Sequence, residues 1–323
     1  MRIVVIGGTG HVGSFLVPRL VRSGHHVVVA SRGTRRPYVE DPAWADVETV
    51  TIDRDAADAD GSFPGLVRDL HADVVIDMVC FTLESARLLV DGLRGEVDHL
   101  IHCGSIWRHG PSLKVPVTED TESEPIGEYG IQKAAIAKLL KDETANGGLT
   151  TTSLHPGHIS GPGWQVVNPI GNVDPGVWQA LAGGTEIDVP GNGAESLAHV
   201  HADDVAQSFA LAVAHRDEAA GEDINITAAS SLTVRGFARI AAGWFGQEPR
   251  LRSVSWEEFR SSTPSAQADA TWDHLYRSPN MSMDKARRLL GYAPAYEPEE
   301  AAYQAVRWLV DHGELEVANP FVS

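Results

Sequence analysis

The first thirteen residues restrict the fold of this chain more than any other stretch. The chain opens MRIVVIGGTGHVG: a mainly β-branched run at 2–6 leads into four glycines, and apolar residues at helical spacing follow at 12–21. Such a run is typical of a buried parallel strand. The sequence therefore predicts a strand, a tight turn and a helix, the arrangement that places a dinucleotide pyrophosphate on a helix N-terminus.

The glycines are spaced Gly7-x-x-Gly10-x-x-Gly13. The first allows a turn that a Cβ would block, the second lets a phosphate approach the backbone, and the third lets the helix pack on the strand. This spacing differs from the G-x-G-x-x-G of most dinucleotide-binding turns, and a glycine-rich turn that binds nothing is the alternative. The residues expected to contact the cofactor here are Gly7, Thr9, Gly10, His11, Val12 and Gly13.

Length and composition exclude several classes of protein. The 323 residues are enough for one large domain or two joined ones, and no apolar run reaches the roughly 20 residues of a membrane helix. The chain starts on its first strand, so we expect no signal peptide. Only Cys80 and Cys103 are present, which excludes a disulfide scaffold and favours a cytoplasmic protein. The net charge of −18 disfavours nonspecific binding to nucleic acid.

Strand-like and helix-like segments alternate over the first half of the chain. Strands are predicted at 2–6, 25–30, 47–52, 73–79, 99–103 and 150–154, and helices at 12–21, 66–70, 83–93 and 129–143. This alternation predicts a doubly wound α/β fold of the Rossmann type, in which helices cover both faces of a parallel sheet. Ligands of such folds bind beyond the carboxyl ends of the strands.

After Pro156 the strict alternation stops, and 157–193 is rich in Gly, Pro and Trp. The remaining predicted elements are helices at 177–181, 203–214, 234–245, 285–290 and 299–310 and a strand at 223–226, with a polar stretch at 261–270. We predict a dinucleotide-binding Rossmann domain of 1–160 plus 202–228. A smaller, discontinuous substrate-binding domain would comprise 161–201 plus 229–323.

The end of the second predicted strand bears on the choice of cofactor. An acidic residue there would bind the ribose 2′-hydroxyl of NAD, but this chain has Ser31 and Arg32, then Arg35. Arginine binds a 2′-phosphate through charge-assisted hydrogen bonds, so NADP is predicted, with NAD as the alternative. Asp53, after the third strand, is expected at the adenine amino group unless it only caps a helix. Two further cofactor contacts are predicted, Met78 and His155, with a structural role as the alternative for His155.

Tyr129 and Lys133 lie four residues apart in a predicted helix and therefore share one face. A free tyrosine has a pKa near 10, and a neighbouring ammonium favours the phenolate, so Lys133 is expected to lower the pKa of Tyr129. Tyr129 would then exchange a proton with a substrate hydroxyl or carbonyl, while Lys133 holds the nicotinamide ribose. Ser105 follows the fifth strand, where its hydroxyl can bind the same substrate oxygen.

These motifs resemble the extended short-chain dehydrogenases/reductases, the NAD(P)-dependent epimerase/dehydratase group. The resemblance covers nearly the whole chain and includes segments at 7–13, 155–163, 199–206 and 283–294. It implies that Ser105, Tyr129 and Lys133 are catalytic and that the protein is a homodimer, joined through the helices near 84–94 and 129–145. Leu197 replaces an arginine common in the nucleotide-sugar enzymes, and Ile106 and Trp107 replace the acidic pair of sugar dehydratases.

Substrate contacts are less defined by the sequence. The candidates are Trp107, Arg108, His109, His158, Trp164 and Tyr276. The alternative is a surface position for Arg108, a hydrogen-bonded structural role for His158, and core packing for the others and for His274, which lies in a segment that the resembling family uses for substrate. His199 and His201 lie on one face of a strand, as metal ligands do, but no third ligand with suitable spacing follows, so we expect no metal.

The sequence as a whole predicts an NADP(H)-dependent oxidoreductase or epimerase. Its substrate would be a secondary alcohol or ketone in a polar, sugar-like or natural-product small molecule, and the same residues serve oxidation, reduction and epimerisation. The alternative is a non-catalytic NAD(P)-sensing or RNA-associated protein on the same fold. The presence of Ser105, Tyr129 and Lys133 argues against a sensor, and the charge of −18 argues against RNA.

Overall fold

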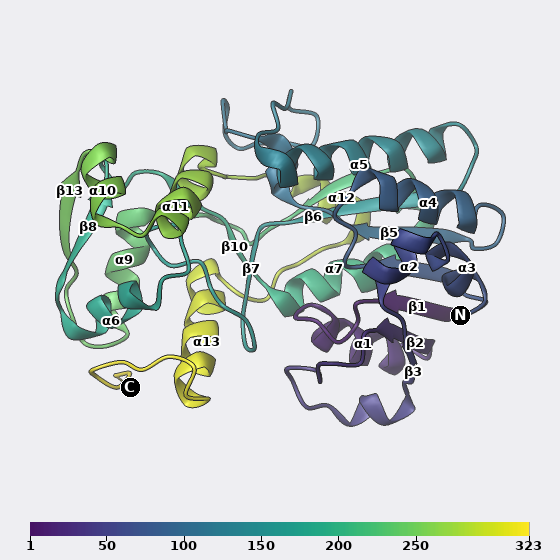
Figure 1. The fold of residues 1–323 in the computed structure, drawn as a ribbon, viewed down its shortest axis with the longest axis horizontal. Helices are drawn as coiled ribbons and strands as arrows, with labels where there is room; N and C mark the ends of the chain where they lie inside the picture. The colour runs from purple at the N-terminus through teal and green to yellow at the C-terminus, as the bar shows by residue number, and fades with distance from the viewer. Residues whose placement is uncertain (323) are drawn as a thin grey trace.

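A seven-stranded parallel sheet forms the centre of the computed structural model, which describes residues 1–322 (Figure 1). The strand order is β11-β6-β5-β4-β1-β2-β3. The strands are β1 (Arg2–Ile6), β2 (His26–Ser31), β3 (Glu48–Thr51), β4 (Val74–Asp77), β5 (His99–Cys103), β6 (Thr151–Pro156) and β11 (Asp223–Ile226). The order reverses direction beside β1, so the predicted doubly wound Rossmann fold is confirmed.

Helices cover both faces of this sheet because successive strand residues point to opposite sides. In β1, Ile3 and Val5 belong to one buried cluster, and Val4 and Ile6 belong to another. The first cluster includes residues of α1 (Gly13–Arg22), α7 (Ala202–Ala214), α8 (Arg216–Ala219) and α12 (Asp284–Leu290). The second includes residues of α2 (Arg54–Asp60), α3 (Phe63–Arg68), α4 (Leu83–Leu93) and α5 (Gly127–Ala145).

A third buried cluster forms a separate core beside the sheet (Figure 1). It is built by α6 (Pro175–Gly183), α9 (Val234–Gly243), α10 (Trp256–Ser262), α11 (Ser265–Arg277), α13 (Pro298–Asp311) and the parallel pair β8 (Glu186–Pro190) and β13 (Arg250–Val254). Two short strand pairs complete the fold: β7 (His158–Ser160) pairs with β10 (His199–His201), and β9 (Ser196–Leu197) pairs with β12 (Leu232–Thr233). There are also two 3-10 helices, η1 (Pro42–Asp46) and η2 (Ile106–His109). The predicted domain division stays a prediction, and α12 packs in the sheet core although its residues were assigned to the second domain.

The sequence prediction misses several short elements. The polar stretch at 261–270 forms the end of α10 and the first half of α11 instead of an irregular segment. In α11, Ala268, Thr271 and Leu275 are buried at helical spacing, but alanine and threonine give only a weak apolar signal. None of the helices within residues 1–322 combines the length and the hydropathy that a membrane span requires.

Candidate active site

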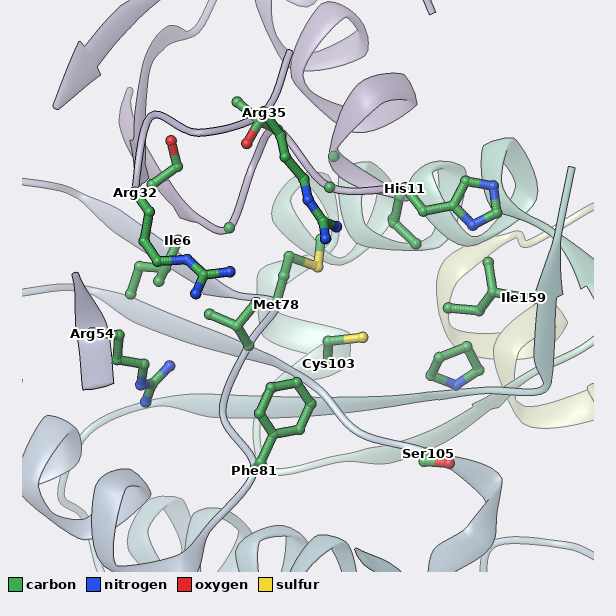
Figure 2. Close-up of a pocket in the computed structure, with 18 of the residues that line it drawn as sticks. Ile6, His11, Arg32, Arg35, Arg54, Met78, Phe81, Cys103, Ser105 and Ile159 are labelled. Atoms are coloured by element: carbon green, nitrogen blue, oxygen red, sulfur yellow. The ribbon is translucent and has the colours of Figure 1, made fainter. Parts of the chain in front are cut away.

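One cavity of ≈ 590 Å³ lies beyond the carboxyl ends of the sheet strands (Figure 2). It brings together residues that are far apart in the sequence, including all the predicted catalytic residues and all but one of the predicted cofactor contacts. The predicted residues that line it are Gly7, Thr9, Gly10, His11, Val12, Gly13, Ser31, Arg32, Arg35, Asp53, Met78, Ser105, Trp107, Tyr129, Lys133, His158 and Trp164.

The glycine turn leaves its backbone open to this cavity. Gly7 has φ +79, a conformation that glycine adopts without strain, and its N–H donates to the Ala30 carbonyl at 2.8 Å. A Cβ on Gly13 would lie 2.1 Å from the Gly8 carbonyl oxygen, so only glycine lets α1 pack this closely on the turn. Gly7, Gly10 and Gly13 line the cavity at the N-terminus of α1, an arrangement that fits a pyrophosphate.

Two arginines approach the cavity from the loop after β2. Figure 2 shows the guanidinium groups of Arg32 and Arg35 directed toward it, and both side chains are exposed. The hydroxyl of Tyr38 lies 3.4 Å from Arg35 Nη1. Asp53 lines the cavity and also caps α2, because its carboxylate accepts from the Asp55 N–H at 3.1 Å. Asp53 therefore caps a helix, which was the alternative to its predicted contact with adenine.

Arg54 is a buried cation beside the cavity that the sequence analysis missed. Its Nη1 donates to Asp77 Oδ1 at 2.6 Å, its Nη2 donates to Ser85 Oγ at 2.9 Å, and the guanidinium carbon lies 4.6 Å from the Phe63 ring centroid. Arg54 and Asp77 are 8% and 2% exposed. No local pattern signals this pair, since its members are 23 residues apart and lie on different elements.

Lys133 is buried, and two of its protons are committed to the backbone. Its Nζ donates to the carbonyls of Cys80 at 2.8 Å and Cys103 at 2.7 Å, and lies 5.7 Å from the Tyr129 ring centroid. Burial lowers the pKa of Lys133. The amine is therefore held beside the Tyr129 ring by carbonyl oxygens that end the predicted fifth strand and precede α4.

Tyr129 is 39% exposed, yet desolvation of its hydroxyl in the cavity raises its pKa to about 12, against a smaller lowering by the Ser105 hydroxyl. This corrects the expectation that Lys133 makes Tyr129 more acidic. The physical reason is that burial of the hydroxyl in the cavity disfavours the charged phenolate. Tyr129 is thus a protonated acid at neutral pH in this structure.

Ser105 is held in the cavity wall by the turn that follows β5. Its hydroxyl oxygen accepts from the Trp107 N–H at 3.2 Å and so caps η2, which leaves the O–H free to donate. The Trp107 ring lies edge-on to Tyr129 with centroids 5.7 Å apart. Ser105 is only 9% exposed.

Four predicted site residues do not line the cavity. Arg108, His109 and His155 turn their polar ends to β11: Arg108 Nη2 lies 3.6 Å from Asp223, His109 Nε2 lies 3.0 Å from Asn225 Oδ1, and His155 Nε2 lies 3.1 Å from Asp223 Oδ1. Tyr276 is 50% exposed and stacks on Trp272. We therefore do not retain these four as contacts of cofactor or substrate.

Aromatic and imidazole side chains line the end of the cavity near Tyr129. Phe81 was not predicted. His274 comes from α11 and lines the cavity, with its ring centroid 4.9 Å from that of His158. Across residues 1–322, the structure holds no cluster of three or more His, Cys, Asp or Glu side chains that could hold a metal ion.

The comparisons with known proteins agree with this geometry. The chain is 30% identical to the 2′-dehydrokanamycin reductase of Streptomyces kanamyceticus over 236 residues, which are 73% of this chain and 64% of the reductase. It therefore matches just under two thirds of that relative's length. The chain is also 27% identical to the chloroplast stem-loop binding protein of 41 kDa b of Arabidopsis thaliana over 305 residues, 92% of this chain and 76% of that protein.

Among solved structures, the UDP-glucose 4-epimerase of Thermotoga maritima with UDP-glucose superposes with a TM-score of 0.73 at 20% identity, over 97% of this chain and 99% of the epimerase. That likeness concerns the fold. The profile of the NAD dependent epimerase/dehydratase family matches residues 3–227, more than half of the chain. The chain therefore belongs to the NAD dependent epimerase/dehydratase family.

Proposed function

We propose that this protein is an NADP(H)-dependent oxidoreductase that reduces a ketone in a polar, sugar-like small molecule. The observation that carries the proposal is the convergence of the glycine turn, the two arginines after β2 and Ser105, Tyr129 and Lys133 on one cavity. Oxidation of the corresponding alcohol and epimerisation would use the same residues. The homodimer and the cytoplasmic location stay predictions.

The proposed roles follow from the contacts in the cavity. A bound nicotinamide dinucleotide would supply the hydride. Tyr129 donates its proton to the carbonyl oxygen, and a pKa raised to about 12 keeps it protonated for that role at neutral pH. The free O–H of Ser105 donates to the same oxygen and orients it. Lys133 has one N–H left for the nicotinamide ribose after its two carbonyl contacts.

The lining of the cavity also bears on the charge of the substrate. Among the described residues, Asp53 and Asp55 are the only carboxylates in the lining, and both are next to Arg54 in the sequence, at the start of α2. The end near Tyr129 offers Trp107 and His158, and both ring nitrogens of the buried His158 lack a hydrogen-bond partner. Such a site can bind hydroxyls or an anionic group but has no carboxylate to hold an amine.

We therefore expect NADPH oxidation with neutral or acidic keto-sugars, and at least about tenfold lower kcat/KM for matched keto-sugars that carry amines, because a tenfold difference corresponds to about 1.4 kcal/mol of binding. The measurement is a spectrophotometric assay over such a panel, with substrate-free NADPH as the control. A preference for the amine-bearing members would contradict the assignment of the substrate's charge. Absence of turnover on every ketone and alcohol, with NADPH still bound, would contradict the enzyme proposal.

An Arg32→Asp substitution is expected to move cofactor preference from NADP toward NAD by about tenfold or more, because a carboxylate repels the 2′-phosphate and accepts from the ribose hydroxyl. The measurement is titration of both cofactors by fluorescence. Arg87→Asp, on α4 and outside the cavity lining, is the matched control. Equal affinities of the unsubstituted protein for NAD and NADP would contradict the proposed role of Arg32.

The second candidate function is a non-catalytic dinucleotide-sensing or RNA-associated protein. The name of the Arabidopsis relative is the observation that favours it, while the net charge of −18 opposes it. The two candidates separate in one experiment: tight NADPH binding without turnover, together with a gel shift of stem-loop RNA at physiological salt, would support the second.

A further inference from the structure

Arg108, His109 and His155, which do not line the cavity, all contact residues of β11, the strand next to β6 in the sheet. All three lie on elements next to Ser105. Arg108 and His109 lie in η2, directly after Ser105, and contact Asp223 and Asn225. His155 lies in β6, between β5 and β11 in the sheet. The turn that carries Ser105 is therefore attached to β11 by polar contacts along its length.

His155 contacts both Ser105 and Asp223. Its Nδ1 lies 3.3 Å from the Ser105 backbone N, which donates to it, and its Nε2 lies 3.1 Å from Asp223 Oδ1. The ring is 0% exposed and packs against the backbone before Ser105, since a Cβ on Gly104 would lie 2.1 Å from His155 Nδ1. Because Nδ1 accepts the Ser105 N–H, the proton of the neutral imidazole is on Nε2 and is donated to Asp223.

Asp223 is suited to fix this tautomer. It is 4% exposed, and Arg108 Nη2 and Lys141 Nζ lie 3.6 Å and 3.9 Å from its Oδ2. Burial raises the pKa of Asp223, but the His155 hydrogen bond and the two cations outweigh it and lower the pKa to about 2. Asp223 is thus an acceptor at neutral pH. Burial lowers the pKa of His155 to about 4, which keeps the imidazole neutral and its Nδ1 free to accept.

We propose that Asp223 and His155 are positioning residues for Ser105: the carboxylate fixes the imidazole tautomer, and the imidazole fixes the Ser105 backbone and hence the direction of its hydroxyl. This inference rests on the proposed function, in which that hydroxyl orients the substrate oxygen. Neither residue touches the cavity, so they act on turnover through Ser105 and not on cofactor binding. Turnover therefore depends on an acceptor at the position of His155 Nδ1, which receives the Ser105 N–H.

Two substitutions of His155 distinguish the role of Nδ1 from the role of Nε2. In His155→Asn the side-chain oxygen takes the place of Nδ1 and can accept the Ser105 N–H, whereas in His155→Gln the side-chain amide takes the place of Nε2 and can only reach Asp223. We expect His155→Asn to keep kcat within about twofold and His155→Gln to lose about tenfold, the effect of one hydrogen bond, with KM and NADPH affinity unchanged in both. Asp223→Leu should behave like His155→Gln, and Asp223→Asn, which keeps an acceptor, should not.

The Ser105→Ala background tests whether the effect passes through the serine. There His155→Gln should cause no further loss of kcat, because the hydroxyl that it misplaces is absent. Equal losses in His155→Asn and His155→Gln, or a loss by His155→Gln that persists in Ser105→Ala, would overturn the proposal. The denaturation midpoint of each variant is measured alongside, since a purely structural role would lower it in both.

A readout that needs no turnover keeps the two proposals separate. Hydrogen exchange of peptides spanning 104–110 should be about tenfold faster at the Ser105 amide in His155→Gln than in His155→Asn and the unsubstituted protein. Faster exchange in His155→Gln together with no turnover of any ketone would refute the proposed function and support the positioning of Ser105. Equal exchange in the three proteins would refute the positioning role, whatever the activity.

Discussion

A Tyr129→Phe variant is expected to lose ketone reduction by about a thousandfold while binding NADPH with unchanged affinity, because the change removes one acidic proton and nothing that holds the cofactor. The phenylalanine ring keeps the edge-on contact with Trp107, so the fold should not change. The measurements are kcat from NADPH oxidation and the NADPH dissociation constant from fluorescence. Full activity of this variant would remove Tyr129 from the chemistry.

The pH dependence of the unsubstituted enzyme gives a second reading of the same group. An acid stays protonated below its pKa, and the pKa of Tyr129 is raised to about 12, so reduction should not fall from titration of Tyr129 between about pH 6 and about pH 9. Activity would be lost only as the pH rises toward that pKa. A loss of kcat on the alkaline side with a midpoint near pH 8, absent from the residual activity of Tyr129→Phe, would show that the phenol is far more acidic during turnover.

An Arg54→Met variant is expected to lose about 3–5 kcal/mol of stability, because it leaves Asp77 as a buried charge without its cation. Asp77 is 2% exposed, and the Val79 N–H at 3.1 Å is the one other donor to its carboxylate within the described residues. The double substitution Arg54→Met with Asp77→Leu should recover most of the loss, since it removes the charge as well as its partner. The measurement is urea unfolding of the three variants.

Lys138→Met is the matched control for that experiment. Lys138 and Asp142 form an exposed pair on α5 at 2.6 Å, with side chains that are 76% and 54% exposed, so its loss should cost less than about 1 kcal/mol. Similar losses in Arg54→Met and Lys138→Met would mean that burial adds nothing to the Arg54–Asp77 pair. A double variant no more stable than Arg54→Met would show that the carboxylate is not the source of the instability.

The elements that the sequence predicted well are those whose pattern is complete within a few residues. β1 and β5 are short, mostly buried strands that were found with their observed bounds, and α4 was found as 83–93 because its buried residues recur at helical spacing. The elements missed are short or polar. β9 and β12 have two residues each, too few for any periodicity, and they form only because the chain brings them together.

The same distinction holds for the site. The glycine turn and the Tyr129–Lys133 pair are local patterns, so the sequence places them in one cavity once the strand order is known. The orientation of the Arg108 and His109 side chains could not be predicted in this way. Both lie in a four-residue 3-10 helix, and their partners are more than a hundred residues away in the sequence. The orientation of Arg54 is likewise set by distant partners, Asp77 and Ser85. The pKa of Tyr129 is also a property of the folded site, because burial in the cavity raises it.

The sheet core and the third cluster are each assembled from three stretches that alternate along the chain. The sheet core takes residues from 3–154, 200–226 and 283–292, and the third cluster takes residues from 166–197, 232–275 and 302–315. The two bodies are interlaced, so a protease that nicks one connecting loop would release neither of them. No uninterrupted portion of the coding sequence encodes either body alone, and a gene split at a single point would leave at least one of the two bodies divided between the halves.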